Sequence, residues 1–321
     1  MMRVGRRFVA VLYLVAACIA AAGAADYEPI KARVMPIAVG AHSYYVQGQG
    51  GVASAANEGY NSNAGFVVTR DGVVVIDALG TPALGHELIE AIKRIAAVPI
   101  KRVIVTHYHA DHIYGLQAFK DIGAEIWAHG GARAYLEGEA QARLAQRRRD
   151  LSPWVDDRTR VVAPDRWLSE NESFELGGVT FDLVHLGPAH SPEDLVVAVR
   201  EEGLLFSGDI MFTGRIPFVG EADSKQWLAT MDRLLALKPK VMVPGHGKVS
   251  TDPRSDLALT RDYLLYLRQT MGRAVEDFVP FEEAYAKTDW SRFAHVPAFD
   301  AANRINAYGT YLLMERESLQ R

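Results

Sequence analysis

The chain has 321 residues, of which 49% are apolar, so it can bury a complete hydrophobic core and is not a disordered protein. Its formal net charge of -4 leaves no excess of basic residues, which excludes a broad nucleic-acid footprint, and we expect no nucleic-acid partner. The one dense basic run, Arg147 to Arg149, follows an Ala- and Glu-rich helical stretch, and we interpret it as a solvated helix end.

Residues 1–25 have the layout of a secretory signal peptide, with a basic start, an apolar middle and a small-residue end. We therefore expect an exported, periplasmic protein whose mature chain starts near Asp26. Cys18, the only cysteine, could instead end a lipobox ("VAAC"), and an acylated Cys18 would then anchor a lipoprotein to the membrane. Arg6 and Arg7 before the apolar stretch are a poor match to a twin-arginine signal. After cleavage, neither an internal disulfide nor a thiolate metal ligand is available.

Short β-branched runs and helical patterns alternate along the first part of the mature chain. Residues 64–77 are two β-branched runs broken by an Asp-Gly pair, which predicts a hairpin. Apolar residues at helical spacing predict a helix over 82–95, with Pro82 at its start. A buried strand is predicted over 101–107.

The same alternation continues over the rest of the chain. The predicted elements are a strand at 124–129, a helix at 132–149, an extended stretch at 179–187, strands at 194–199 and 203–209, a helix at 224–237 and a strand at 240–247. Because no repeat or linker interrupts the pattern, we expect one domain over 26–321, with a helical extension from about 254. Hairpins combined with helices between strands indicate a layered αββα or mixed α/β architecture.

A histidine cluster lies in the segment "THYHADH", where His107, His109 and His112 fall within six positions, with Asp111 among them. Imidazole binds transition metals as a neutral nitrogen donor, so the cluster predicts a metal site. His107 and His109 alternate around one residue and would point to the same side of an extended segment. Asp111 and His112 can face a second direction, so one segment could serve two metals.

Three isolated residues complete the candidate ligand set. They are His190 in "GPAHSPEDL", Asp209 in "FSGDIMF" and His246 in "VPGHG". Each lies next to the end of a predicted strand, where open sheets assemble their sites, and each has a glycine within three residues. A purely structural role would leave many buried polar groups unpaired at these strand ends.

The combination HxHxDH, GPxHS, SGD and PGHG, in this order between about residues 64 and 247, resembles the metallo-β-lactamase superfamily. The resemblance implies an αββα sandwich of that type, with two mixed β-sheets flanked by helices. It also implies the ligands: a first metal on His107, His109 and His190, a second on Asp111, His112 and His246, and Asp209 as the bridge. The expected cofactors are two Zn²⁺ ions, and the same donors also suit iron or manganese.

The resemblance further implies a metal-dependent hydrolase that acts on a small-molecule ester, thioester, amide or lactam. Two metals that share a water lower its pKa, so that hydroxide can attack a carbonyl, and Asp111 would orient this hydroxide or shuttle its proton. Secreted β-lactamases of the family generally carry cysteine where Asp209 stands. The chain is therefore more similar to glyoxalase-II-like thioesterases and to exported hydrolases associated with sulfur oxidation or quinoprotein pathways.

Two alternatives to hydrolysis stay open. An iron-dependent sulfur dioxygenase resembles the same family, although such enzymes leave the second site empty, whereas Asp111, His112 and His246 are all present here. A metal-binding accessory factor of a periplasmic oxidation system is the non-enzymatic alternative. The sequence predicts neither the physiological substrate nor the oligomeric state.

Several further residues are candidates for supporting roles. Asp77 follows a predicted strand, and in the family that this chain resembles an aspartate there commonly supports the metal loop by hydrogen bonding. Arg215 could bind a substrate carboxylate, with surface solvation or a structural ion pair as equal alternatives. His129 is interpreted as a structural residue or as a support for the ligands. The segment "GYNSN", residues 59–63, could line the pocket.

Overall fold

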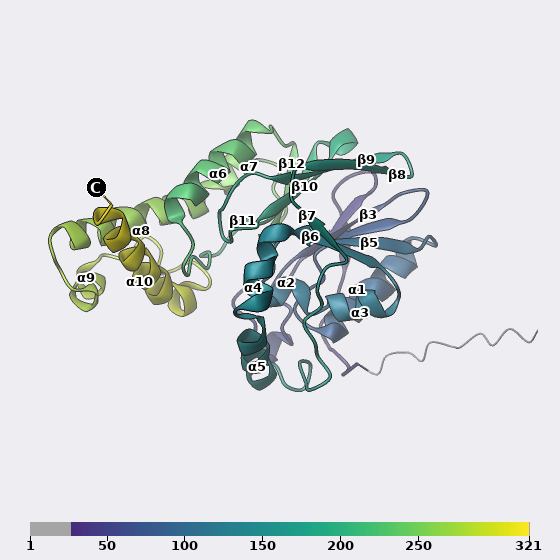
Figure 1. Cartoon of the computed structure of the whole chain (residues 1–321), viewed down its shortest axis with the longest axis horizontal. Coiled ribbons are helices and arrows are strands. Elements are labelled where there is room, and N and C mark those ends of the chain that lie inside the picture. The colour runs from purple at the N-terminus through teal and green to yellow at the C-terminus, as the bar shows by residue number, and fades with distance from the viewer. Residues whose placement is uncertain (1–26, 321) are drawn as a thin grey trace, which may run out of the picture.

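The protein is an αββα sandwich in which two β-sheets pack face to face and helices cover both outer faces (Figure 1). This computed structural model describes residues 27–320, so the expected signal peptide and Cys18 lie outside the described residues. The α/β class and the layered architecture predicted from the sequence are confirmed. Within the described residues, no helix is both long enough and apolar enough to span a membrane.

The first sheet has seven strands in the order of the sequence. They are β1 (Pro36–Ala38), β2 (Ser43–Val46), β3 (Ala64–Val68), β4 (Val73–Ile76), β5 (Ile100–Val105), β6 (Glu125–His129) and β7 (Arg166–Leu168). Strands β1 to β4 pair antiparallel, and β4 to β7 pair parallel. The sheet is therefore mixed, and the hairpin predicted at 64–77 is confirmed as the β3–β4 pair.

The second sheet has five strands in the order β12-β11-β10-β9-β8. They are β8 (Glu172–Leu176), β9 (Val179–His185), β10 (Leu195–Val199), β11 (Leu204–Phe212) and β12 (Val241–His246). All neighbours pair antiparallel except β11 and β12, which are parallel. This parallel pair brings the chain around Asp209 next to His246.

Helices follow the strands of both sheets. Those of the first half are α1 (Pro82–Ile95), α2 (Ala110–Ile113), α3 (Leu116–Asp121), α4 (Arg133–Glu137) and α5 (Ala140–Asp150). Those of the second half are α6 (Ser224–Ala236), α7 (Pro253–Asp256), α8 (Ala258–Glu276), α9 (Phe281–Lys287) and α10 (Phe299–Ser318). Short 3-10 helices occupy Ala55–Asn57, Gly130–Ala132 and Arg200–Glu202.

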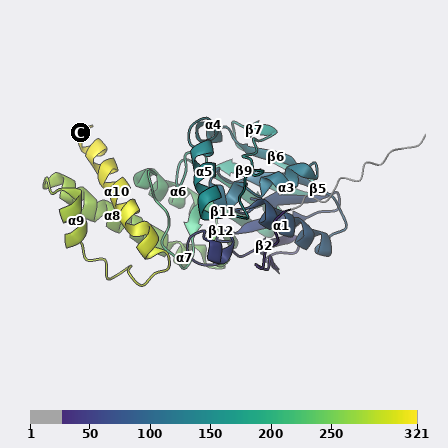
Figure 2. The same cartoon turned by 90° about the horizontal axis from the view of Figure 1, so that it is seen from below.

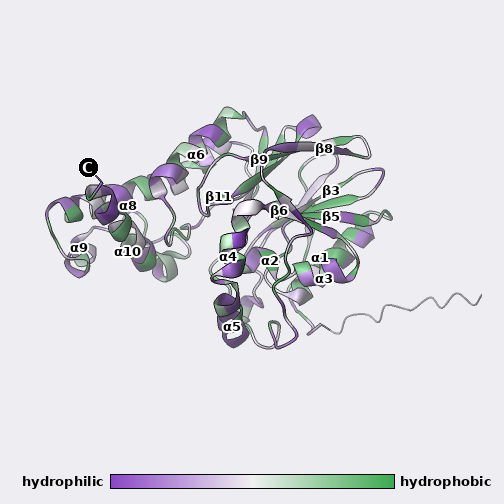
Figure 3. Ribbon diagram, in the orientation of Figure 1, coloured by the Kyte–Doolittle hydropathy of each residue, from purple (hydrophilic) through white to green (hydrophobic). Residues whose placement is uncertain are grey.

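Strand β4 shows how the sequence divides the core into layers. Val73 and Val75 pack with the helices outside the first sheet, whereas Val74 and Ile76 pack between the two sheets. This alternation follows from the two-residue period of a strand. Figure 3 shows hydrophobic residues in the strands and a hydrophilic α5 on the outside.

Helices α8, α9 and α10 form a lobe at one end of the molecule (Figures 1 and 2). The lobe continues the core that Trp227 and Met231 of α6 form on the outer face of the second sheet. Asn306 of α10 ties the lobe to the loop that follows β11, since its side chain accepts a hydrogen bond from Val219 N at 2.7 Å and donates one to Pro217 O at 2.7 Å. The lobe therefore fixes a loop that begins four residues after Asp209.

Two details of the predicted elements are wrong. The helix predicted over 132–149 is broken into α4 and α5 around Gly138, a residue that is unfavourable inside a helix. The strand predicted to end at Asp209 continues to Phe212, because its pairing with β12 resumes after irregular positions around Gly208.

Candidate metal centre

All seven candidate ligands come together where the two sheets meet. They form three overlapping groups, and within each group the ligand atoms lie within 4.8 Å of one another. His107 and His109 lie in the loop after β5, and Asp111 and His112 lie on α2. His190 lies between β9 and β10, Asp209 lies within β11, and His246 ends β12. Residues far apart in the sequence thus meet at one place.

The first group consists of His107, His109 and His190. His109 Nδ1 lies 2.8 Å from His190 Nε2. Asp209 Oδ2 lies 3.4 Å from His190 Nε2 and 3.8 Å from His107 Nε2. Two imidazole nitrogens of this group therefore face one carboxylate oxygen, and His109 lies beside His190.

The second group consists of Asp111, His112 and His246. His246 Nε2 lies 3.4 Å from Asp111 Oδ2 and 3.4 Å from Asp209 Oδ2. His112 Nε2 lies 3.4 Å from Asp209 Oδ1. Because Asp209 faces members of both groups, it occupies the position of a bridging ligand.

The residues fit divalent metal ions. His107 Nε2, His112 Nε2 and Asp209 Oδ1 are buried and have no hydrogen-bond partner among the residues described. Leaving such atoms unpaired costs about 1–3 kcal/mol each, so their convergence calls for a ligand that satisfies them together. A set of imidazoles and carboxylates without thiolate suits zinc, iron or manganese.

Hydrogen bonds on the outer side of the imidazoles set their orientation. Nδ1 of His107 contacts Thr106 Oγ1 at 3.0 Å, and Nδ1 of His112 contacts Asp77 Oδ2 at 3.0 Å. Nδ1 of His190 contacts Phe218 O at 2.8 Å, and Nδ1 of His246 contacts Asn61 O at 2.8 Å. These contacts leave Nε2 of all four rings facing the centre, as in metal sites generally.

Asp77 supports both sides of the centre. Its Oδ1 accepts from Thr106 N at 2.8 Å, and its Oδ2 accepts from Thr106 Oγ1 at 2.8 Å as well as contacting His112. Asp77 also has a φ of 60°, a left-handed conformation that is costly for a residue other than glycine. Its backbone N–H donates to Ile104 O at 3.0 Å, which helps to hold this conformation.

Burial and neighbouring charges set the protonation of the cluster. Burial lowers the pKa of His107 well below its usual value and that of His190 to about 3, so both rings are neutral at pH 7 and can donate to a metal. Burial acts the same way on His112, but the carboxylates of Asp209, Asp77 and Asp111 outweigh it and raise the pKa of His112. Burial would raise the pKa of Asp209, but His246 and His112 hold it well below its usual range.

The segment 59–63, which we named only as a pocket lining, holds the second group in place. Asn61 Nδ2 donates to Asp111 Oδ2 at 2.8 Å, and the Ser62 hydroxyl donates to Asp111 O. Asn63 Nδ2 donates to Pro244 O and Gly247 O, at 2.8 Å each, on either side of His246. The sequence signal was a run of three polar residues directly before a buried strand.

Glycine is required beside the bridging carboxylate. A Cβ atom on Gly245 would lie 1.9 Å from Asp209 Oδ1, a contact that no side chain could tolerate. The glycine of the "PGHG" motif therefore makes room for the carboxylate between β11 and β12.

Arg215 and His129 lie in different surroundings. Arg215 is buried, at 4% exposure; its Nη1 donates to Gly51 O at 2.7 Å and lies 3.1 Å from His246 Nδ1. Burial lowers the pKa of Arg215, and the nearby Asp209 and Asp111 oppose this, so surface solvation does not describe this residue. His129 stands outside the cluster and stacks on His185 with ring centroids 4.3 Å apart.

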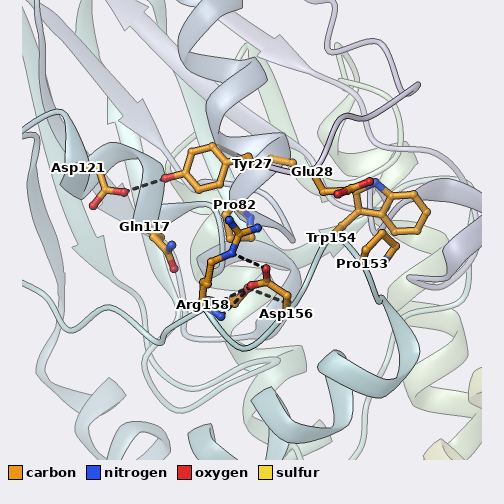
Figure 4. Close-up of a pocket in the computed structure, with 11 residues that line it drawn as sticks. Tyr27, Glu28, Pro82, Gln117, Asp121, Pro153, Trp154, Asp156 and Arg158 are labelled. Carbon is orange, nitrogen blue, oxygen red and sulfur yellow. Dashed lines mark hydrogen bonds and ion pairs between the residues drawn. The ribbon is translucent and has the colours of Figure 1, made fainter. Parts of the chain in front are cut away.

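A cavity of about 160 Å³ lies away from the cluster, at the start of the described chain (Figure 4). Its walls include Tyr27, whose hydroxyl donates to Asp121 at 2.8 Å, and Trp154, whose indole donates to Pro29 O at 3.1 Å. None of its lining residues belongs to the metal-ligand groups. The chemistry therefore has to be sought at the cluster.

Comparison with known proteins gives one family match that covers the cluster. A family model described as the metallo-beta-lactamase superfamily matches residues 57–246, which include all seven candidate ligands. The hydroxyacylglutathione hydrolase GloC of Haemophilus influenzae is 29% identical over 175 residues, which cover 52% of this chain and 79% of that protein.

Two alkylsulfatases are also similar to the chain. The linear primary-alkylsulfatase of a Pseudomonas strain is 23% identical over 240 residues, which cover 63% of this chain and 45% of that protein. Among solved structures, the sec-alkylsulfatase Pisa1 from Pseudomonas has a TM-score of 0.66 at 18% identity and covers 87% of this chain and 50% of that one. The chain therefore spans about half the length of either alkylsulfatase.

Proposed function

The chain belongs to the metallo-beta-lactamase superfamily, and from that premise we propose that it is an exported hydrolase that uses two metal ions, zinc in the first place, to cleave a carbonyl substrate. The proposed substrates are small esters, thioesters, amides or lactams. The observation that carries the proposal is the convergence of seven nitrogen and oxygen donors, three of which have buried atoms without a partner in the described chain.

The candidate ligands would divide between two cations. His107, His109 and His190 would hold one cation, Asp111, His112 and His246 the other, and Asp209 would contact both. Two bound divalent cations would supply hydroxide at neutral pH and stabilise the negative charge that develops on the substrate.

Asp111 is the residue of the cluster best placed to orient the attacking water and to take up its proton. Burial disfavours its charged form, but His112 and His246 overcome this and hold its pKa well below its usual range, so it stays a hydrogen-bond acceptor. Asn61 Nδ2 occupies one side of Asp111 Oδ2 at 2.8 Å and fixes the plane of the carboxylate. A fixed acceptor beside the nucleophile orients the attacking water for reaction.

Arg215 supports the same site from the second sheet. Its guanidinium lies against His246 at 3.1 Å and is buried, so its charge acts at short range on groups at the centre. We include in the proposal that Arg215 attracts a negatively charged group of the substrate or of the transition state.

The test combines metal analysis of the mature protein with hydrolysis assays on nitrocefin, a glutathione thioester, an aryl ester and an alkyl sulfate. The alkyl sulfate is included because two relatives are named for that activity. Two zinc ions per chain with turnover of one carbonyl substrate would support the proposal. One iron per chain without hydrolysis would favour sulfur oxidation, and two metals without any turnover would favour an accessory factor.

The variant that tests the role of the cluster is His109→Ala. It removes one nitrogen donor from a part-buried position, so we expect hydrolysis to be lost with little change in thermal unfolding of the metal-free protein. His129→Ala is the matched control, because His129 is also part-buried but lies outside the metal-ligand groups. Full activity of His109→Ala with its metal content verified would refute the mechanism.

A further inference from the structure

The basic run on α5 has three arginines in three different environments. The guanidinium of Arg148 binds the loop 156–159, with Nε donating to Asp156 O at 2.8 Å and Nη2 to Thr159 O at 2.9 Å. Arg149 is exposed and donates to Gln146 Oε1. Arg147 is half-buried and has neither an ion pair nor a side-chain hydrogen bond with any described residue. The interpretation of the run as a solvated helix end therefore fails for Arg148, whose guanidinium is bonded to backbone carbonyls.

Arg147 lies on the side of α5 that faces the metal centre. Leu144, one turn earlier on the same face, is buried at 3% exposure in the core beneath the first sheet. Helix α5 packs against α2, the helix that carries Asp111 and His112 (Figure 1). The positive charge of Arg147 accordingly helps to lower the pKa of Asp111, after the larger effects of burial and of the neighbouring histidines.

Two tyrosines belong to segments that pack against α5, namely Tyr135 on α4 and Tyr114 directly after α2. Both hydroxyls are buried and approach each other, and neither has another hydrogen-bond partner in the described part of the chain. Tyr135 packs edge-on against His109 with ring centroids 6.1 Å apart. A tyrosine hydroxyl carries a proton in neutral solution, so that of Tyr114 can donate a hydrogen bond.

These groups share one chemical requirement. An arginine offers five N–H donors and no acceptor, and a protonated phenol offers one O–H donor. A half-buried guanidinium without a counter-ion gains most from an anion whose oxygens can accept two of its hydrogens together. Carboxylate and sulfate groups both have this geometry.

We propose that Arg147, assisted by the hydroxyl of Tyr114, binds an anionic oxygen group of the substrate beside the metal centre. The group is a carboxylate or a sulfate, held on the α5 side of the site, away from Arg215 on the second sheet. The inference rests on the proposed function, because only a hydrolase has a substrate to bind. It adds that the natural substrate carries a negative charge.

The experiment measures binding of non-reacting anions to the metal-loaded mature protein by calorimetry. The probes are succinate, sulfate and the neutral succinamide, and the variants are Arg147→Met and, as matched control on the same helix, Arg149→Met. A charge-assisted hydrogen bond contributes about 1.5–3 kcal/mol, so Arg147→Met should weaken binding of the preferred anion by about tenfold or more. Arg149→Met should change it by less than about twofold, because its charge is exposed.

The relative loss for succinate and for sulfate identifies which anion the site prefers. Wild-type affinity in Arg147→Met, or an equal loss in Arg149→Met, would overturn the proposal. If Arg147→Met does not fold, Arg147→Gln, which keeps a polar side chain, is measured in its place with the same expectations. Since binding requires no turnover, a protein that hydrolyses nothing can still pass this test.

Turnover gives a second measurement if hydrolysis is found. For a carboxylated aryl ester compared with its neutral counterpart, Arg147→Met should raise KM by about tenfold only for the charged substrate and leave kcat within a few-fold. An equal rise in KM for both esters would assign Arg147 a structural role and overturn the inference.

Discussion

Replacing Asp77 by asparagine would test how far the outer hydrogen bonds determine metal binding. The amide must place its oxygen at Oδ1, because the backbone N–H of Thr106 donates there at 2.8 Å. The amide nitrogen then replaces Oδ2, the atom that contacts His112 Nδ1 at 3.0 Å. Two donors would face each other, so His112 would have to move its proton to Nε2, the atom that faces the centre.

The size of the effect follows from the bonds that change. The bond from Thr106 N survives, Thr106 Oγ1 can accept from the new amide, and only the bond to His112 is lost outright. A hydrogen bond to a charged group contributes about 1.5–3 kcal/mol, and loss of such an outer partner generally lowers metal affinity about 10–100-fold. We expect this loss at the group that contains His112, and a smaller one at the group that contains His107.

The assay is a titration of the metal-free protein with zinc in competition with a chelating dye, which would resolve the two binding steps that the proposed function requires. Asp121→Asn serves as the control, since Asp121 bonds Tyr27 and Arg160 outside the cluster. Two steps of wild-type affinity in Asp77→Asn would refute the reasoning. An equal drop in both steps together with a destabilised metal-free protein would show a general folding defect instead.

Two smaller predictions concern hydrogen bonds made by single side chains. Asn61→Ala removes the donor to Asp111 Oδ2 and should lower kcat about tenfold while metal analysis still finds both ions; an unchanged kcat would contradict an orienting role. Asp223 caps α6 by accepting from Lys225 N and Gln226 N, at 3.0 Å each, so Asp223→Ala should cost about 1 kcal/mol in urea unfolding at pH 7. Although partial burial acts to raise the pKa of Asp223, these bonds lower it, so the stabilisation exists above the unfolded pKa of about 3.9 and fades as pH falls through the folded value. An equal loss at pH 7 and below the folded pKa would contradict this assignment.

The sequence was most informative where chemistry and spacing coincide in one segment. His107, His109, Asp111 and His112 could be grouped in advance because six consecutive residues contain them, and the structure places them in the expected two groups. Their role as ligands stays a prediction. The layered core could be predicted equally well, since alternate residues of β4 pack on opposite faces of the sheet.

The features that the sequence did not predict depend on tertiary packing. The end of β11 was misjudged because "SGD" has the composition of a turn, whereas parallel pairing with β12 carries the strand on to Phe212. The inward side of α5 was invisible because Leu144 and Ala140 are its only buried residues in this hydrophilic helix. The polar run at Asn61 did not predict its partners, since Asp111 and His246 lie 50 and 185 positions away along the chain.

The candidate ligands come from both sheets, so metal binding would affect how firmly the two sheets are held together. Four candidate ligands follow β5 of the first sheet, and three belong to the loops and strands of the second. Bound cations would therefore link two layers that also meet through apolar contacts and through the hydrogen bonds of Asn63, much as a disulfide would in a chain with more than one cysteine. An ion that binds only the folded state adds about 4 kcal/mol of stability when its free concentration is a thousandfold above its Kd. Removal of the metal ions would then destabilise the contact between the two sheets first.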